Sequence, residues 1–438
     1  MDAMAIVEAI QGWVAWLDTM RRPEGYAGPV THWWQNCLYF TGAGLDWRYE
    51  GIIIGCLNLL HRTGDPAWLA RAQRAGDDLL RGQLADGRFR HSSFELNPYP
   101  GGTPHEAACD LALLHLASAL RERSDPAWSA YLEAARRNIR DVQVAALWDE
   151  QAHSFRDHAH IPSLVPNKGA TLVEALCTLA ELTGDEVWIQ RYALPTLEAV
   201  LAHQVRGGAL DGAIHQYSQH GRRVAAFFPL YVARCVPALL AGYAYTEDER
   251  WVDAALRAIA FVLRWQYDDG SFPQAVYAGG RVNRYPQWVA GVGDILRSML
   301  LLEPYGLQAD REQSEAWLLR GCEPHGAVRT AHGFAAQVRQ RDPGPVPEFR
   351  DLLPVVGWGD KAFRYLSEVL AGEPGATWVS RDQAMAEAWE ATCQFRSIEC
   401  RYRENCSAIE LWRGPELWYR WRKGARWAEV CAPDSFWK

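Results

Sequence analysis

Hydrophobic and polar positions recur along this chain with the spacing of α-helices, in two alternating kinds of segment. One kind is apolar around most of its circumference and carries only occasional charges, whereas the other bears Arg and Asp along one side. Apolar positions three and four residues apart predict helices, and a helix that is apolar on most sides is predicted to be buried. The predicted apolar helices are 45–62, 104–123, 170–183, 225–245 and 285–303.

The amphipathic segments begin at a repeated signal, an Asp a few residues ahead of a Trp. The Asp side chain can cap the first backbone N–H groups of a helix, and the Pro or acidic residue that follows suits the first helical turn. Successive Trp residues lie 60, 60 and 63 positions apart, so the signal predicts a repeat. The four signals end at Trp68, Trp128, Trp188 and Trp251.

Each repeat therefore holds two helices, which cannot bury their apolar faces alone and must stack on neighbouring repeats. We predict a mainly α fold, an α/α toroid of five to six helical hairpins, with the apolar helices as the inner ring. The segment 3–21 is expected to be the outer partner of the first inner helix, and a sixth pair is expected to begin near 310–320. An open solenoid is the alternative, although neither end of the chain shows a polar capping repeat.

The pattern changes after residue 306, and residues 341–358 contain four Pro. A helix is predicted at 361–370, and alternating positions over 392–431, interrupted by Gly, predict a small antiparallel β meander. We therefore divide the chain into a toroid, residues 1–340, and a C-terminal extension, residues 341–438, packed on the toroid.

Two segments share a further motif, in which Gln is followed after two spacers by Asp-Gly and after one more by Phe, at Gln83–Phe89 and 266–272. This motif resembles the repeats of the terpenoid-cyclase and prenyltransferase toroids, which end in Trp. The chain is also similar in architecture to the (α/α)6 toroids of glycoside hydrolases, polysaccharide lyases and sugar epimerases. The resemblance implies an α/α toroid, in which the Gln bonds backbone groups and Asp-Gly makes a turn, so the motif is structural.

An isoprenoid substrate is the first alternative that this resemblance implies. Terpenoid cyclases carry Asp-x-Asp-Asp or Asp-Asp-x-x-Asp, but Asp77-Asp78 and Asp268-Asp269 lack the acids that would complete either pattern. No match to the zinc ligands of the protein prenyltransferases is found either. The hypothesis of a terpenoid-cyclase-like enzyme is therefore ranked second to that of an enzyme that acts on a carbohydrate.

The overall composition excludes some classes of partner. A net charge of -8 argues against nucleic acid, which is bound through clustered Lys and Arg. No apolar run is long enough to span a bilayer, and the acidic N-terminus does not resemble a signal peptide, so a cytoplasmic location is expected. The 21 Trp and 17 Tyr are many for this length; some are expected to fill helix seams and others to line a groove for sugars.

In a toroid the site lies among the loops that lead into the inner helices, and polar and aromatic residues cluster in five such loops. Cleaving or rearranging a sugar needs carboxylates or a His base, beside aromatic rings that stack on the sugar. For any single acid, a cap or an ion pair is the commoner role. The catalytic candidates are Asp46, Glu50, Glu106, Asp110, Asp157, Asp211, His158 and His215, with Asp360 and Lys361 as weaker ones. The substrate-binding candidates are Trp33, Trp34, Trp47, Tyr49, His105, His160, Tyr217, Arg223, Arg284, Tyr285 and Trp288.

No metal or other cofactor is expected. His158 and His160 lie on one side of an extended segment and could bind a divalent metal if an acid from another loop joined them, but no third ligand has a fixed spacing. The Cys at 393, 400, 406 and 431 form no Cys-x-x-Cys pair and are expected to pack in the meander.

These observations predict an enzyme that acts on a glycan or a small molecule, as a glycoside hydrolase first and as a lyase or epimerase on a uronate-containing glycan second. A non-catalytic toroid that binds a glycan or a protein is the alternative of a different class. The hydrolase reading requires two carboxylates of the site within about 10 Å of each other. The oligomeric state is left open.

Overall fold

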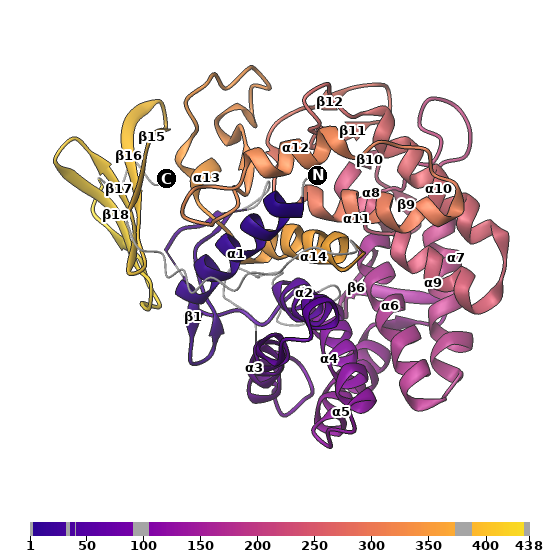
Figure 1. The fold of residues 1–438 in the computed structure, drawn as a ribbon. Coiled ribbons are helices and arrows are strands. Elements are labelled where there is room, and N and C mark those ends of the chain that lie inside the picture. The colour runs from indigo at the N-terminus through magenta and orange to yellow at the C-terminus, as the bar shows by residue number, and fades with distance from the viewer. Residues whose placement is uncertain (1–2, 32–35, 40, 91–104, 373–387, 433–438) are drawn as a thin grey trace.

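Six apolar helical segments form a closed inner ring in the computed structural model, which describes residues 3–31, 36–39, 41–90, 105–372 and 388–432. Each inner segment packs on the next, and the last, α14, packs on the first, α2, so the ring has no open end (Figure 1). The toroid is therefore confirmed, with six hairpins in the described residues. The inner segments are α2 (Arg48–Thr63), α4 (His105–Glu122), α6 (Pro166–Thr183), α8 with α9 (Pro229–Ala233 and Val236–Thr246), α11 (Val292–Leu302) and α14 (Val356–Gly372).

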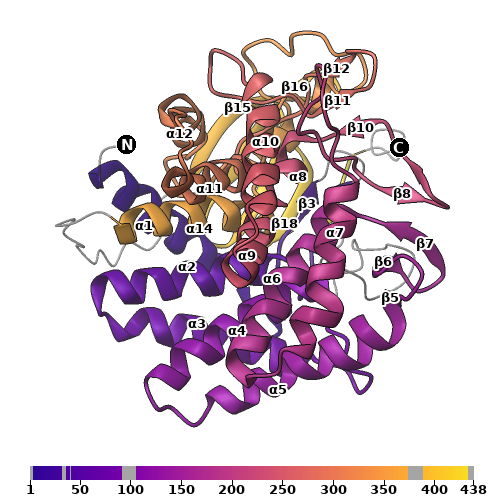
Figure 2. The ribbon, with the colours of Figure 1, turned by 90° about the vertical axis from the view of Figure 1, so that its right-hand side faces the viewer.

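The outer ring consists of the amphipathic helices, which bury one side against the inner ring (Figure 2). Two of them contain π-helical turns, η1 and η2, beside their α-helical part. The outer segments are α1 (Ala3–Thr19), α3 (Pro66–Gly82), α5 with η1 (Trp128–Asn138 and Ile139–Leu147), η2 with α7 (Trp188–Ala193 and Leu194–Ala202), α10 (Glu249–Arg264) and α12 (Glu312–Arg320).

The caps predicted from the repeated Asp are confirmed. The carboxylates of Asp65 and Asp248 accept the backbone N–H groups of the second residue beyond them, at 2.9 Å in both cases. The same bond recurs at Asp125 and Asp185, at 3.0 and 3.1 Å. A side-chain cap satisfies an N–H group that has no partner within the helix, so these Asp residues fix where each outer segment begins.

The ring closes in a way that the sequence did not predict. The N-terminal helix α1 packs on α14, where Trp13 stacks on Phe363 with ring centroids 4.6 Å apart, and not on the first inner helix. The expected pairing of 3–21 with the first inner helix is therefore wrong. The other inner segments pack on the outer helix that follows them in the chain, and within the described residues no helix follows α14, so α1 fills that place. The helix that we expected in the extension, at 361–370, belongs to the toroid, so the division at residue 340 cuts through the sixth hairpin.

Short strands edge the loops that lead into the inner helices. They form small antiparallel sheets in the orders β1-β2, β3-β4, β5-β6-β7-β8-β9, β10-β11-β12 and β13-β14. The loop before α14 also holds the short helices η4 (Phe334–Ala336) and α13 (Phe349–Leu352), and η3 (Glu303–Tyr305) directly follows α11. The strands are β1 (Arg21–Arg22), β2 (Gly25–Tyr26), β3 (Val30–Thr31), β4 (Asn36–Cys37), β5 (Trp148–Asp149), β6 (Ser154–His158), β7 (Ile161–Leu164), β8 (Ser218–Gln219), β9 (Arg222–Arg223), β10 (Ala226–Phe227), β11 (Ala275–Tyr277), β12 (Val282–Asn283), β13 (Gln287–Trp288) and β14 (Ala331–His332).

The C-terminal meander is confirmed as a five-stranded antiparallel sheet in sequential order, and it lies at one side of the ring (Figure 1). The buried carboxylate of Glu404 joins this sheet to the toroid, since it accepts the indole N–H of Trp16 on α1 at 2.8 Å and pairs with Lys423 at 2.7 Å. No helix in the described residues combines the length and the apolarity that crossing a bilayer requires. The strands are β15 (Trp389–Phe395), β16 (Ile398–Glu404), β17 (Ala408–Arg413), β18 (Glu416–Arg422) and β19 (Glu429–Val430).

Candidate active site

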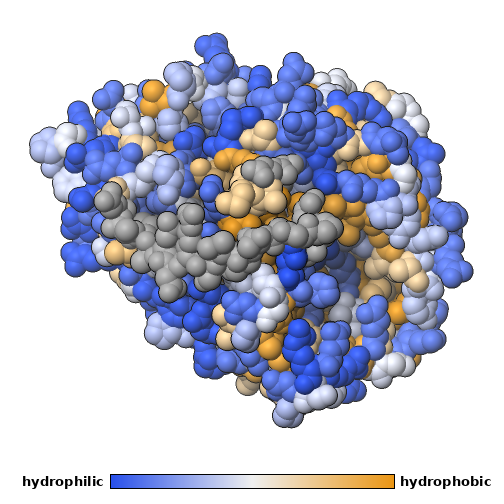
Figure 3. Space-filling model, in the orientation of Figure 1, coloured by the Kyte–Doolittle hydropathy of each residue, from blue (hydrophilic) through white to orange (hydrophobic). Residues whose placement is uncertain are grey.

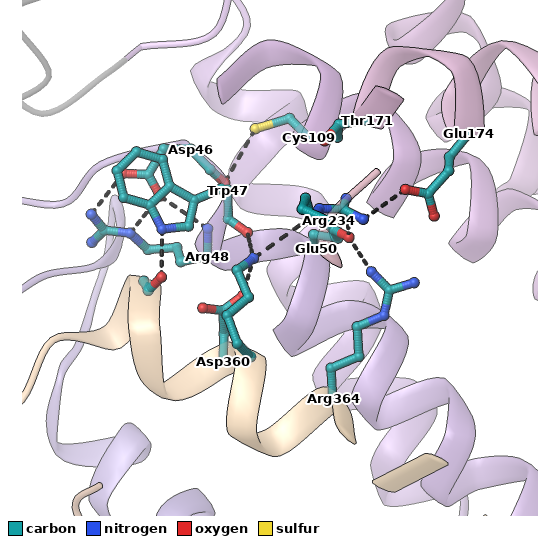
Figure 4. Close-up of polar contacts among 12 residues, drawn as sticks. Asp46, Trp47, Arg48, Glu50, Cys109, Thr171, Glu174, Arg234, Asp360 and Arg364 are labelled. Carbon is teal, nitrogen blue, oxygen red and sulfur yellow. Dashed lines mark hydrogen bonds and ion pairs between the residues drawn. The ribbon is translucent and has the colours of Figure 1, made fainter. Parts of the chain in front are cut away.

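Ionisable side chains from all six inner segments meet at the centre of the ring, which we call the lumen. Each lies within an otherwise apolar helix or at its end, and their interactions with one another place them together across the ring. Figure 4 shows Glu50 with Arg234 and Arg364 beside it and Glu174 beyond Arg234. The six are Glu50, His115, Glu174, Arg234, Arg297 and Arg364.

Glu50 is the hub of this cluster. One of its oxygens accepts Arg234 at 2.8 Å and also pairs with Arg364, while the other lies 3.8 Å from the Lys361 ammonium. Burial alone would raise the pKa of Glu50, but the Arg234, Lys361 and Arg364 charges outweigh it and hold that pKa below its ordinary value. A carboxylate held ionised by three cations anchors the helices that carry them.

The remaining lumen charges are paired in the same way. Arg234 reaches from Glu50 to Glu174, which it contacts at 2.7 Å, and Arg297 pairs with Glu368 at 2.8 Å. His115 is kept neutral, because burial and then Arg364 and Arg297 lower its pKa to about 4. Buried charges are stable only when they are paired. Here Arg234 with Glu174 and Arg297 with Glu368 join neighbouring inner segments, and the bond from Arg234 to Glu50 joins two that are not neighbours. The deep lumen is therefore a fixed network of ion pairs.

A second group lies where the inner helices begin, an end that we call the mouth. Asp294 is in the first turn of α11, and Asp360 and Lys361 are near the start of α14. Lys361 lies 3.0 Å from one Asp360 oxygen, and the other oxygen has no hydrogen-bond partner among the described residues. Burial raises the pKa of Asp360 well above its usual range, against the opposing charge of Lys361. Burial therefore favours the protonated form of Asp360.

Asp294 has the opposite character. Its side chain is partly exposed, and within the described residues no hydrogen bond or ion pair holds its carboxylate. It lies near enough to Asp360 to raise the pKa of that carboxyl, and near enough to Lys361 to raise the pKa of the ammonium. The mouth thus holds two carboxyl groups in unlike surroundings, one buried and one open to solvent.

Three tryptophans line the mouth beside these carboxyl groups. Trp288 stacks on Trp358 with centroids 4.6 Å apart, and Trp358 lies 6.4 Å from Trp47. The Trp47 indole N–H donates to the Gly357 carbonyl, which ties the start of α2 to the start of α14. Trp47 is partly exposed and the other two are buried, so Trp47 presents the accessible part of this aromatic wall. Figure 3 shows apolar residues gathered toward the middle of the face seen in Figure 1, with hydrophilic residues around them.

Two of the acids proposed from the sequence, Asp46 and Glu106, are buried in contacts that hold the fold. Both Asp46 oxygens pair with Arg48, each at 2.7 Å. Glu106 accepts the Phe89 backbone N–H at 3.1 Å and the side-chain amide of Asn138 on the outer ring. The structure gives both carboxylates a packing role at the starts of α2 and α4.

Asp110 is fully buried, and neither of its oxygens has a hydrogen-bond partner among the described residues. It follows Glu106 by four residues and so shares the face of α4 that meets the outer ring, whereas His115 lies about 140° further round, toward the lumen. Burial, and then the charge of Glu106, raises the pKa of Asp110 well above its usual range. Burial therefore favours the protonated form of Asp110 between the two rings.

The Asp157, His158 and His160 segment lies on strand β6 and the turn after it. Asp157 pairs with Lys168, and His158 Nδ1 accepts the backbone N–H of His160 at 3.1 Å. Burial lowers the pKa of His158, and the neighbouring His160 lowers it further. In the described part of the chain, no three His, Cys, Asp or Glu side chains gather as a metal ion would require.

Asp211 lies in a structural turn. Its carboxylate accepts the Gly207 N–H at 2.6 Å and pairs with Arg257 on outer helix α10 at 2.9 Å. The turn is a further copy of the Gln and Asp-Gly motif, since Gln204 donates to the Gly212 and Ala254 carbonyls. This copy holds an insertion between Gln204 and Asp211, so the motif was not recognised in the sequence. Asp211 was therefore predicted to lie in the site.

The other predicted binding residues divide between the core and the rim. Tyr49 is fully buried and donates to Asp78 at 3.2 Å, so it has a packing role, and His215 is held by the Val224 carbonyl at 2.7 Å. Three exposed residues lie on the strands and turns outside the lumen, and one of them, Arg284, lies 5.4 Å from the ring of buried Tyr285. The exposed three are Tyr217, Arg223 and Arg284. Trp33, Trp34 and the side chain of His105, which begins α4, lie outside the described residues.

Sequence reasoning therefore found Glu50, Trp47 and Trp288, and gave Asp360 and Lys361 less weight than the structure does. It missed the charges that stand alone inside apolar helices, and that isolation was the available signal, because a lone charge in a buried helix needs a partner. The missed residues are Glu174, Arg234, Asp294, Arg297 and Arg364.

No protein-family model and no curated protein matches the chain in sequence. Solved structures do match it in fold. A possible member of the GH105 family from Klebsiella pneumoniae has a TM-score of 0.59 at 12% identity, over 84% of this chain and 92% of that one. An unsaturated glucuronyl hydrolase specific for heparin has a TM-score of 0.58 at 12% identity, over 84% and 97%. An α-1,6-mannanase, GH76A, of Salegentibacter sp. has a TM-score of 0.54 at 12% identity, over 84% and 100%. The shared architecture is the (α/α)6 toroid.

Proposed function

We propose that this protein is a carbohydrate-active enzyme, and a glycoside hydrolase in the first place. The observation that carries the proposal is the pair Asp360 and Asp294 at the mouth, beside an aromatic wall. Glycoside hydrolysis needs one carboxyl group that is protonated and one that is ionised, and groups in unlike surroundings divide these roles. The glycan-acting proteins that share the fold support the same class of substrate.

In this proposal Asp360 is the general acid. Burial favours its protonated form, and that proton is donated to the glycosidic oxygen as the bond breaks. Asp294 is the partner carboxylate, which activates water or attacks the anomeric carbon. Trp47 offers a ring on which a sugar can stack, beside the starts of α2 and α14.

Two carboxyl groups of the lumen meet the 10 Å requirement of the hydrolase prediction, and they are Asp360 and Glu50. Lys361 lies 3.0 Å from an Asp360 oxygen and 3.8 Å from a Glu50 oxygen, so those two oxygens are no more than about 7 Å apart. Glu50 is not assigned a catalytic role, because three cations already hold it. Its role is to fix Lys361, and through Lys361 the position of Asp360.

A lyase or epimerase on a uronate-containing glycan is the second candidate. The observation in its favour is the buried Lys361, an ammonium between two carboxyl groups that could also neutralise a substrate carboxylate. An isoprenoid enzyme is less well supported, because its cavity would be apolar and this lumen is charged. A non-catalytic toroid that binds a glycan or a protein is a further alternative, and the ion pairs that fill the deep lumen favour it. An assay of turnover distinguishes this alternative from an enzyme.

The test uses the full chain, the variants Asp294→Asn and Asp360→Asn, and the control Asp211→Asn, which removes a carboxylate from an outer turn. Neutral, uronate-containing and sulfated glycans are supplied, and new reducing ends and ultraviolet-absorbing unsaturated products are measured. Turnover of at least one glycan is expected, with about 100-fold or greater loss in each site variant and little change in the control. Formation of unsaturated products would show that the enzyme is a lyase. Full activity of both site variants would exclude Asp294 and Asp360 as the catalytic pair.

A further inference from the structure

Four exposed arginines stand on neighbouring hairpins at the rim of the ring. Arg222 and Arg223 form strand β9, Arg281 is at the turn between β11 and β12, and Arg284 follows β12. The strands bring them together, because the segment that follows β9 continues as β10 and pairs with β11, with Ala226 opposite Tyr277. Both ribbon views show β10, β11 and β12 on one side of the molecule (Figures 1 and 2). We call these four residues the arginine rim.

Aromatic rings hold two of these side chains in place. The Arg281 guanidinium lies 4.1 Å from the centre of the Tyr277 ring, and Arg284 lies 4.5 Å from the Tyr267 ring. Arg284 also lies 5.4 Å from the Tyr285 ring, whose backbone is anchored by Gln340. A guanidinium that rests on a ring keeps its N–H donors directed outward, and less conformational freedom is then lost when an anion binds.

No acid side chain within the described residues forms an ion pair with any arginine of the rim. Some exposed arginines of the outer helices, by contrast, have carboxylate partners: Arg191 has Glu150 at 3.0 Å and Arg250 has Glu198 at 3.0 Å. The acids near the rim are bound elsewhere: Asp269 accepts the Ser271 N–H at 2.9 Å and Asp342 accepts the Gly344 N–H at 2.8 Å. In a chain of net charge -8, the rim is a patch of positive charge.

The rim is continuous with the mouth along the chain. The loop that carries Arg284 continues through Trp288 of the aromatic wall to Asp294 in the first turn of α11. Exposed Tyr217 stands beside Arg223 on the paired strand, since the Val224 N–H bonds the Tyr217 carbonyl at 2.9 Å. Guanidinium groups pair with carboxylates and sulfates, and Tyr rings stack on sugars.

We propose that the arginine rim binds the acidic groups of a polyanionic glycan chain whose reacting residue occupies the mouth. The proposal rests on the proposed function for the sugar nature of the occupant, and the charge of the occupant follows from the rim itself. Carboxylate and sulfate share the chemistry that the rim recognises, so the test includes a glycan of each kind.

The experiment measures binding of heparin, polygalacturonate and neutral dextran to the full chain carrying Asp294→Asn, so that turnover does not interfere. On this background, Arg281→Gln with Arg284→Gln removes one half of the rim and Arg222→Gln with Arg223→Gln the other. The matched control, Arg191→Gln with Arg250→Gln, removes the same charge from outer-ring arginines that have acid partners.

At low salt we expect each rim variant to lose about tenfold or more in affinity for at least one acidic glycan, with the control within about twofold and dextran unbound. Added salt should weaken the binding. Rim variants that bind as tightly as the control would overturn the inference, as would equal binding of dextran. An oligonucleotide bound as tightly as the glycans would overturn the choice of occupant. Because binding and turnover are measured separately, a rim that fails while the wild type still cleaves a glycan leaves the proposed function standing.

Discussion

Gly326 lies directly against the backbone of Gly12 at the point where the ring closes. A Cβ on Gly326 would overlap the Gly12 carbonyl oxygen, and the φ of Gly326 is +96°, a conformation that suits glycine. The same approach recurs in earlier units, where Gly212 lies against Arg257 and Gly270 against Gln313. In these three turns the glycine thus sets the spacing between the loop and the outer helix that it meets.

Gly326→Ala is expected to destabilise the protein by about 3 kcal/mol, because the new Cβ meets fixed backbone as well as an unfavourable φ. Urea unfolding measures the change. Gly344→Ala is the matched control, since Gly344 has a φ of +77° but nothing within 4 Å of the new Cβ, and it should cost about 1 kcal/mol. Equal losses would show that ring closure does not depend on this contact.

Gln83→Leu tests the scaffold role of the repeated motif. The Gln83 side chain donates to the Gly87 carbonyl at 3.0 Å and to Ala134 of the next outer helix at 2.8 Å. Its loss should cost about 1–3 kcal/mol by leaving both carbonyls without this donor. Gln219→Leu, on an exposed strand position, should change stability by no more than about 0.5 kcal/mol. A Gln83 variant as stable as this control would assign the motif another role.

Glu50→Gln should destabilise the protein by about 3–5 kcal/mol at neutral pH, because three buried cations lose their shared counter-charge. The comparison is Asp18→Asn, which removes one partner of the exposed Arg71 pair and should cost less than about 1 kcal/mol. Unfolding in urea gives both values.

The pH dependence of that difference has a definite sign. The Glu50 pKa is lowered in the folded state, so its stabilisation is present above the unfolded carboxyl pKa of about 4.3 and is lost as the pH falls below it. The stability gap between the wild type and Glu50→Gln should therefore narrow below about pH 4. A gap that is constant across that range would mean that Glu50 is not held ionised.

Asp110→Asn should show the opposite trend. Burial raises the pKa of Asp110, so its folded form is favoured only while it is protonated, and the wild type loses stability as the pH rises above the unfolded value of about 3.9. The Asn variant has no such loss, so its stability relative to the wild type should increase as the pH rises above about 4. Asp157→Asn, which removes a partner of Lys168, should show no such increase.

The ring itself was predictable because its signals are local. An Asp cap, a Trp three residues on and an apolar helix before them can be read within one unit, and Asp65 and Asp248 act as expected. The number of hairpins and the partner of α1 could not be read in this way. They depend on closure, which brings together segments from the two ends of the toroid.

The lumen was only partly predictable, for a related reason. Glu50 stood out because it follows an aromatic loop, but Arg234 and Arg364 lie far from it in sequence and look like single charges in apolar helices. Asp46 and Glu106 stood out equally, yet each has a partner that removes it from solvent. Proximity to the start of an inner helix therefore identifies candidate acids. Only the ion pairs and hydrogen bonds that each acid forms distinguish a structural acid from a candidate for catalysis.

The pairing of α1 with α14 has a consequence for the order in which this molecule is made. Helix α1 is synthesised before α14 and remains without this inner partner until nearly the whole toroid has been made, so closure is a late, long-range step in folding. Until then, the flanks of α2 and α11 that α14 covers are exposed and prone to association. The same helix brings Asp360, Lys361 and Arg364, so an unclosed chain also lacks half of the candidate site. Ring closure therefore also brings the residues of the candidate site together.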